Sequence, residues 1–120
     1  MIWIMPAASV VATADVDLAT ARFFRVLGDA NRLRILELLL EGPRTVSELA
    51  TALDAPSGRV SNHLACLRWC RFVEDERQGR TVVYRIADSD VAEALVLGRR
   101  LAAGHCEHLA TCGRIGPAWI

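Results

Sequence analysis

The sequence contains no lysine, a single tyrosine and only four cysteines among its 120 residues. Four thiols are too few for the disulfide framework of a small secreted domain, and their spacing matches no such framework. No apolar run reaches the length of about 18 residues that a transmembrane helix needs. The apolar start, residues 1–6, lacks the basic residues that open a signal peptide, so we interpret it as a docking arm. These absences predict a soluble, cytoplasmic protein with reduced thiols.

Net charge is absent as well, because fourteen arginines balance fourteen acidic residues. This balance excludes a histone-like polycation and an acidic tail, but it does not exclude a local basic patch. The sequence also lacks a Cys-x-x-Cys pair, a nucleophile elbow, a phosphate-binding loop and a paired-carboxylate motif, so we expect no enzyme. The length is that of one small domain. A domain of this size buries a limited share of its surface on its own, which is consistent with a dimer that shares a core.

The spacing of apolar residues predicts four helices in the first 70 residues. These helices cover about residues 15–27, 32–41 and 45–53 and the segment from Ser57 onward. Gly28 and Gly42-Pro43 end the first two helices, and Thr45 with Glu48 has the pattern of a capping box at the start of the third. The tight turn at residues 54–57 gives the third and fourth helices the dimensions of a helix-turn-helix.

After the fourth helix the pattern changes to that of strands, from Phe72 to Ile86, with a turn at residues 77–80. A last helix is predicted from about Asp88 to Thr111, ending at Cys112-Gly113. The fold class is therefore mainly α with a small β-hairpin, which is a winged helix-turn-helix with flanking helices. The domain is expected to span residues 15–112, between an N-terminal arm (residues 1–14) and a C-terminal tail (residues 113–120).

Positive charge gathers in the predicted helix-turn-helix and wing. Residues 56–86 hold six arginines against three acidic residues, so this segment is net positive by three and the remainder net negative by three. Hydroxyl, amide and guanidinium groups at the start of the fourth helix suit bases or phosphates, and arginines at the wing tip suit phosphates or the minor groove. The alternative is a solvated, charged surface. The candidates for contact with double-stranded DNA are Ser57, Arg59, Ser61, Asn62, His63, Arg77 and Arg80.

Two of the four cysteines, Cys66 and Cys70, are spaced to share one face of the fourth helix. Two thiols at this spacing can bind a single ion, and thiolates select soft metals over magnesium or calcium. Because buried cysteine also behaves as a small apolar residue, a purely structural role is the alternative.

The other two cysteines, Cys106 and Cys112, lie near the end of the last predicted helix. At a spacing of six they point about 120° apart on a helix, so both could serve one ion only if the helix ended between them. One of them, from the same chain or a partner, could complete a three-thiolate site, which would favour cadmium, lead or mercury over zinc. His105 and His108 are possible nitrogen ligands, although histidines near a helix C-terminus are more often solvated.

Two runs carry a resemblance to a known family: Leu27-Gly28-Asp29-Ala30-Asn31-Arg32-Leu33-Arg34-Ile35-Leu36 and Val60-Ser61-Asn62-His63-Leu64-Ala65-Cys66-Leu67. They resemble the ArsR/SmtB family of bacterial metal-responsive repressors over roughly residues 16–112. The resemblance implies a homodimer formed by the first and last helices. It also implies that the fourth helix and wing bind operator DNA, and that an inducer releases the DNA.

The segment from Ser61 to Cys70 is similar to the cadmium- and lead-sensing subgroup of that family, and some members serve mercury resistance. This similarity implies that Cys66 and Cys70 bind the metal together with Cys112, with Cys106 as an additional candidate. The cysteine pair that arsenic sensors carry in the third helix is absent at residues 44–48. The acidic and histidine residues near the last helix do not have the spacing of zinc or nickel sensors.

The sequence therefore predicts a dimeric repressor that a divalent thiophilic metal (mercury, cadmium or lead) releases from DNA, with no organic cofactor and no membrane partner. The first alternative is a thiol-redox repressor with no metal inducer. Since cysteines at i and i+4 form a strained bridge, that switch needs a pairing such as Cys66 with Cys112. The second alternative is a regulator that responds to another inducer and uses its cysteines in the core.

Overall fold

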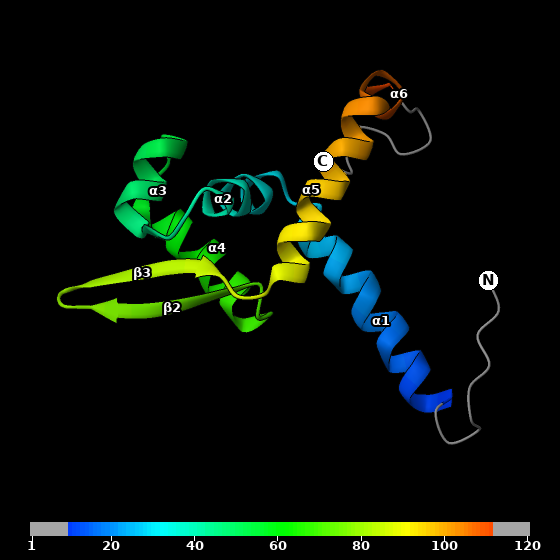
Figure 1. The fold of residues 1–120 in the computed structure, drawn as a ribbon, viewed down its shortest axis with the longest axis horizontal. Helices are drawn as coiled ribbons and strands as arrows, with labels where there is room; N and C mark the ends of the chain where they lie inside the picture. Colours follow the sequence, from blue (N-terminus) through cyan, green and yellow to red (C-terminus); the bar gives the residue numbers. More distant parts are fainter. Residues whose placement is uncertain (1–9, 112–120) are drawn as a thin grey trace.

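The computed structural model describes residues 10–111, and side chains from Asp15 onward (Figure 1). Helices surround one edge of a small antiparallel sheet, as expected for a winged helix-turn-helix. No helix in this part of the chain is both long and apolar enough to cross a bilayer. The elements are α1 (Val10–Leu27), α2 (Ala30–Leu40), β1 (Arg44–Thr45), α3 (Val46–Leu53), α4 (Ser57–Trp69), β2 (Val73–Gln78), β3 (Thr81–Ile86), α5 (Ser89–Gly104) and α6 (Cys106–Ala110).

Polar side chains cap the starts of α2 and α3. Asp29 Oδ1 accepts hydrogen bonds from the backbone N–H groups of Asn31 (2.9 Å) and Arg32 (3.1 Å). At the start of α3 the Thr45 hydroxyl accepts from Glu48 N (3.2 Å), and Glu48 Oε1 accepts from Thr45 N (2.9 Å). This capping box lowers the pKa of Glu48, because its carboxylate accepts the Thr45 N–H and interacts with the Thr45 side chain. The predicted capping box at the start of α3 is confirmed.

A single core joins α2, α3, α4, the start of the wing and α5. Each of these elements directs apolar residues toward the others, and seven side chains are almost completely shielded from solvent. The apolar stripe of α4, formed by Val60, Leu64 and Leu67, is part of this set. The shielded side chains are Ile35, Leu36, Leu49, Val60, Leu64, Leu67 and Val73.

The sheet has three strands in the order β1-β3-β2, rather than the two of a simple hairpin. The wing itself, β2 and β3, is confirmed and pairs in register from Val73 opposite Ile86 to Gln78 opposite Thr81. Gly79 supplies the positive φ (65°) that the first central position of a two-residue turn requires. The additional strand, β1, pairs Arg44 with Tyr84 just before α3 and ties the helix-turn-helix to the wing.

Helix boundaries differ from the predicted ones at both ends of the described chain. α1 begins at Val10, five residues before the predicted start at residue 15. The predicted last helix is interrupted, because α5 ends at Gly104 and α6 begins at Cys106. His105, with φ −128° and ψ 22°, lies between them outside the helical region. Gly104 has the poorest helix propensity apart from proline, which weakens the helix at this point.

The molecule is extended rather than spherical. Its radius of gyration is 16.9 Å, whereas a compact chain of this length has about 14 Å. In Figure 1, α1 and α5 project from the helix-turn-helix and wing in different directions. Both helices expose large apolar side chains, which are Val16, Leu18 and Phe24 on α1 and Val96, Leu97 and Leu101 on α5. Such uncovered apolar area on projecting helices is typical of a subunit that shares an interface.

Candidate DNA interface and thiol site

The start of α4 presents most of its predicted DNA-contacting residues to solvent. Ser57, Arg59, Ser61 and Asn62 are exposed, as a helix that enters the major groove requires. His63 differs, because it is half-buried and lines a small cavity between α2 and α4 with Asn31 and Arg34. Its ring is therefore less available to DNA than its neighbours on α4.

The wing directs two further arginines outward. Arg77 is the penultimate residue of β2 and Arg80 lies in the turn, and both are exposed. No carboxylate within residues 15–111 lies within ion-pair distance of Arg59, Arg77 or Arg80. Their charges are therefore available for phosphates.

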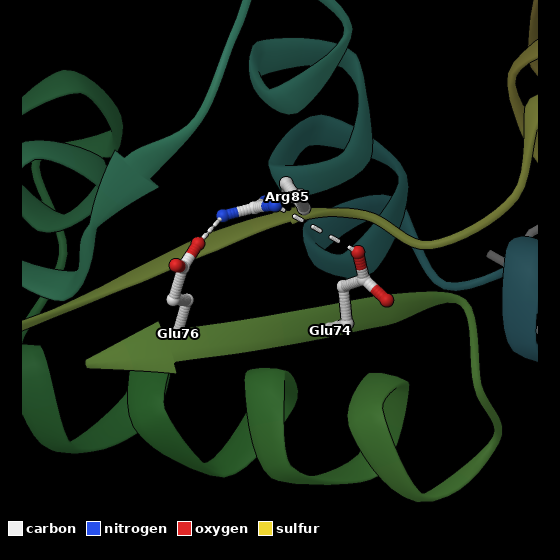
Figure 2. Close-up of polar contacts among 3 residues, drawn as sticks. All are labelled: Glu74, Glu76 and Arg85. Atoms are coloured by element: carbon white, nitrogen blue, oxygen red, sulfur yellow. Dashed lines mark hydrogen bonds and ion pairs between the residues drawn. The ribbon is translucent and has the colours of Figure 1, made fainter. Parts of the chain in front are cut away.

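Two of the six arginines counted in this basic segment are instead neutralised by the wing's own acids. Arg68 Nη1 lies 3.1 Å from Asp75 Oδ2. This ion pair joins the last turn of α4 to β2. Figure 2 shows Arg85 between Glu74, whose carboxylate lies 4.0 Å away, and Glu76, with which it forms a hydrogen-bonded ion pair. The arginines of this segment that have no described carboxylate within ion-pair distance are Arg59 at the start of α4, Arg71 just after α4, and Arg77 and Arg80 at the wing tip.

Cys66 and Cys70 lie one turn apart at the C-terminal end of α4. Cys70 is the C-cap rather than a helical residue, but its N–H still donates to Cys66 O at 3.0 Å, so the helical spacing is kept. Both thiols are reduced, half-buried and adjacent. The predicted pair is therefore present, with both sulfurs on one side of the helix.

The backbone just after Cys70 turns sharply. Arg71 adopts a positive φ of 64°, a left-handed conformation that is usually occupied by glycine at the end of a helix. The N–H of Phe72 donates to Leu67 O at 2.9 Å, and that of Arg71 donates to Arg68 O at 3.0 Å, which is a Schellman motif. The thiol pair thus lies directly beside the hinge between α4 and the wing.

The environment of Cys70 favours its neutral form. Burial raises the pKa of the Cys70 thiol, and the adjacent Cys66 raises it further, while the Arg32 guanidinium acts in the opposite direction. Arg32 comes from α2, and its Nε is buried without a hydrogen-bond partner among the described residues. Sequence spacing gives no signal for this guanidinium, because α2 and the end of α4 are far apart along the chain.

The third sulfur of the predicted site is not beside this pair in the described chain. Residues 15–111 contain no group of three histidine, cysteine or acidic side chains placed to hold a metal ion. Cys106, exposed on α6, lies at the end of α5 that is distant from the wing (Figure 1). α5 is about 24 Å long, so Cys106 does not reach Cys66 and Cys70 of its own subunit in this arrangement. Cys112 lies outside the described residues. His105 and His108 accompany Cys106 at the exposed end.

Comparison with known proteins establishes the family. The sequence pattern described as "Bacterial regulatory protein, arsR family" matches residues 29–75, from the cap of α2 to the start of the wing. A probable mercury resistance operon repressor of Streptomyces lividans is 40% identical over 109 residues, which cover 88% of this chain and 87% of that protein. This chain belongs to the ArsR family. The resemblance seen in its sequence is confirmed.

Two further proteins are similar to this chain. The transcriptional regulator CmtR of Mycobacterium tuberculosis, described in its solved structure as a cadmium metal sensor, is 47% identical over 77 residues. Those residues cover 64% of this chain and 65% of CmtR. A homodimeric winged helix-turn-helix DNA-binding domain from Mycobacterium bovis superposes with a TM-score of 0.75 at 33% identity and covers 89% of this chain and 95% of that domain. These relatives are transcriptional regulators, and the fold is the DNA-binding winged helix-turn-helix.

Proposed function

We propose that this ArsR-family protein is a cytoplasmic homodimeric repressor that leaves its operator when a thiophilic metal ion binds Cys66 and Cys70. The observation that carries the proposal is the adjacent thiol pair at the junction of α4 and the wing. The names of the S. lividans and M. tuberculosis relatives, which refer to mercury resistance and cadmium sensing, support a soft metal.

The donor chemistry fits such an ion. Two adjacent thiols offer two soft ligands, and thiolate ligands favour soft ions over magnesium or calcium. The third thiolate would come from Cys112 or Cys106, with the partner subunit as the source of Cys106 because of its distance from the pair in one chain. Mercury, cadmium and lead all remain candidates for the ion.

The position of the ligands explains how binding would reach DNA. Cys66 and Cys70 bracket Arg68, whose ion pair with Asp75 links α4 to β2. Fixing both sulfurs would restrict the last turn of α4 and, through this ion pair, the angle of the wing. A coupling free energy of about 1–3 kcal/mol would lower operator affinity roughly 5- to 150-fold.

A titration of the reduced protein with cadmium, mercury, lead and zinc under anaerobic conditions tests the proposal. We expect a near-ultraviolet thiolate-to-metal absorption that saturates at one soft ion per subunit and is lost in Cys66→Ser and Cys70→Ser. The parallel variants Cys106→Ser and Cys112→Ser identify the third ligand. No absorption with any ion would refute the metal site, and DNA release by an oxidant alone would favour the redox alternative.

A further inference from the structure

Basic and polar side chains from two helices line the small cavity between α2 and α4. The cavity has a volume of about 20 Å³, and its polar lining comes from the N-terminal half of each helix. Asn31 and Arg34 belong to α2, and Arg59 and His63 belong to α4. The remaining lining residues are apolar, and both arginines are exposed. The fold therefore brings together two guanidinium groups that are distant in the sequence.

Neither arginine of this cavity is neutralised by a described acid. No ion pair within residues 15–111 includes Arg34 or Arg59. The acid that precedes α2, Asp29, directs its Oδ1 to the backbone N–H groups of Asn31 and Arg32. Because two positive charges beside one cavity repel each other, an anion between them would be stabilised.

The size of the cavity determines where such an anion can lie. A space of about 20 Å³ holds roughly one water molecule, so a larger anion can bind only at the solvent-facing mouth. Guanidinium groups bind phosphate oxygens through paired N–H donors, and the exposed amide of Asn31 supplies further donors. The residues at the mouth therefore match a phosphate group.

The orientation of α4 indicates the source of this phosphate. At about 100° per residue, Arg59 and Arg68 lie on opposite flanks of the helix, since nine residues separate them. Arg68 faces the wing through its ion pair with Asp75. Arg59 therefore lies on the flank that faces away from the wing, beside α2.

A recognition helix fills the groove that it enters. The major groove of DNA is about 12 Å wide, which is close to the diameter of a helix with its side chains. When α4 lies in this groove, the two phosphate strands run along its two flanks. The wing then meets one strand, and the start of α2 meets the other.

We propose that Asn31 and Arg34 of α2, together with Arg59 of α4, bind a phosphate of the DNA backbone beside the major groove. α2 is then a third DNA-contacting element in addition to α4 and the wing. A phosphate contact orients the protein and carries no base information. The proposal rests on the DNA binding of this family and not on the metal site, so every test uses reduced, metal-free, full-length protein.

The salt dependence of DNA affinity tests Arg34. Arg34→Gln should lower the slope of log affinity against log salt by about 0.9, both for a duplex selected from a random pool and for an unrelated duplex. Arg34→Lys keeps the charge and should keep the slope. The control Arg99→Gln, on α5, should also leave it unchanged. An unchanged slope in Arg34→Gln would overturn the proposal, whereas a wild-type protein that binds neither duplex would refute DNA binding itself.

A substitution at Asn31 separates the phosphate contact from helix stability. Asn31→Asp adds a carboxylate to the first turn of α2, where the helix dipole favours negative charge, so stability in urea should not decrease. The same carboxylate repels a phosphate and should weaken DNA binding about fivefold or more. Ser89→Asp adds this charge to the first turn of α5 and should change DNA affinity by less than about twofold. Equal weakening by both variants would overturn the contact, because net charge alone would explain it.

Ethylation interference on the selected duplex identifies the phosphate itself, because ethylation removes the charge of one phosphate at a time. We expect at least one phosphate whose ethylation weakens binding of the wild-type protein but not of Arg34→Gln. Identical interference patterns for the two proteins would overturn the proposal. If, in addition, inorganic phosphate raised the melting temperature of the wild-type protein but not of Arg34→Gln, the site would bind a free anion instead of DNA.

Discussion

Cys66 and Cys70 lie where α4 passes into the wing, so a ligand that joins their sulfurs acts on both DNA-binding elements. Their adjacency follows from helix periodicity, because residues four apart share a face. Their surroundings could not be predicted in this way. Arg32, and the α1 residues that line a cavity together with Cys70, lie beside this thiol only through tertiary packing of segments about 40 residues or more away in the chain.

Metal affinity should increase with pH. Since burial and Cys66 raise the pKa of Cys70, this thiol is protonated at neutral pH and must lose its proton to bind an ion. Below the pKa, each displaced proton changes apparent affinity about tenfold per pH unit. Competition titrations with cadmium at pH 6, 7 and 8 should show that apparent affinity increases at least about tenfold per pH unit. A pH-independent affinity would mean that Cys70 is not a ligand.

Replacing Arg71 by glycine should stabilise the fold. The left-handed conformation of Arg71 costs a non-glycine residue about 1 kcal/mol or more, and glycine removes that cost at some expense in unfolded-state entropy. We expect Arg71→Gly to raise the free energy of unfolding in urea by about 0.5–1 kcal/mol. Asp54, which ends α3 with φ 51°, provides the matched control. Because aspartate tolerates this region, Asp54→Gly should raise the free energy of unfolding by less than Arg71→Gly does. A larger increase for Asp54→Gly would contradict this explanation.

At the scale of elements, local signals specified most of the chain. Capping residues, glycines and apolar spacing predicted α2, α3, α4 and the wing, because these features act within one or two helical turns. β1 was missed, since two residues have no periodicity and form a strand only by pairing with β3. The break at His105 was missed because helical residues lie on both sides of it. The ion pairs of Arg68 and Arg85 likewise depend on the register of the wing.

The concentration of charge at the wing tip predicts a salt dependence. Each arginine that contacts a phosphate contributes about 0.9 to the slope of log affinity against log salt. Arg80→Gln should therefore lower this slope by about 1 for a duplex selected from a random pool. Arg99→Gln removes the same charge from α5, where Arg99 pairs with Glu37 at 2.9 Å, and should leave the slope unchanged. An equal decrease of this slope in both variants would show that net charge, and not the position of the arginine, determines the salt dependence.

For the whole molecule, the extended shape and the uncovered apolar residues of α1 and α5 favour a dimer through these helices. A charge placed in such an interface is buried twice by symmetry, which is costly. Leu97→Asp should therefore weaken dimerisation at least tenfold in sedimentation experiments. Thr51→Asp places the same charge on exposed α3 and should have no effect. A dimer unaffected by Leu97→Asp would place the interface elsewhere.

The most direct test of the central claim is the reciprocal coupling between metal and DNA. Operator affinity is measured by fluorescence anisotropy with and without cadmium, and cadmium affinity with and without DNA, both under anaerobic conditions. We expect cadmium to lower operator affinity and DNA to lower cadmium affinity by the same factor, about 5 to 150. Both effects should disappear in the Cys66→Ser, Cys70→Ser double variant. Cadmium-dependent release that persists in this double variant would contradict the account.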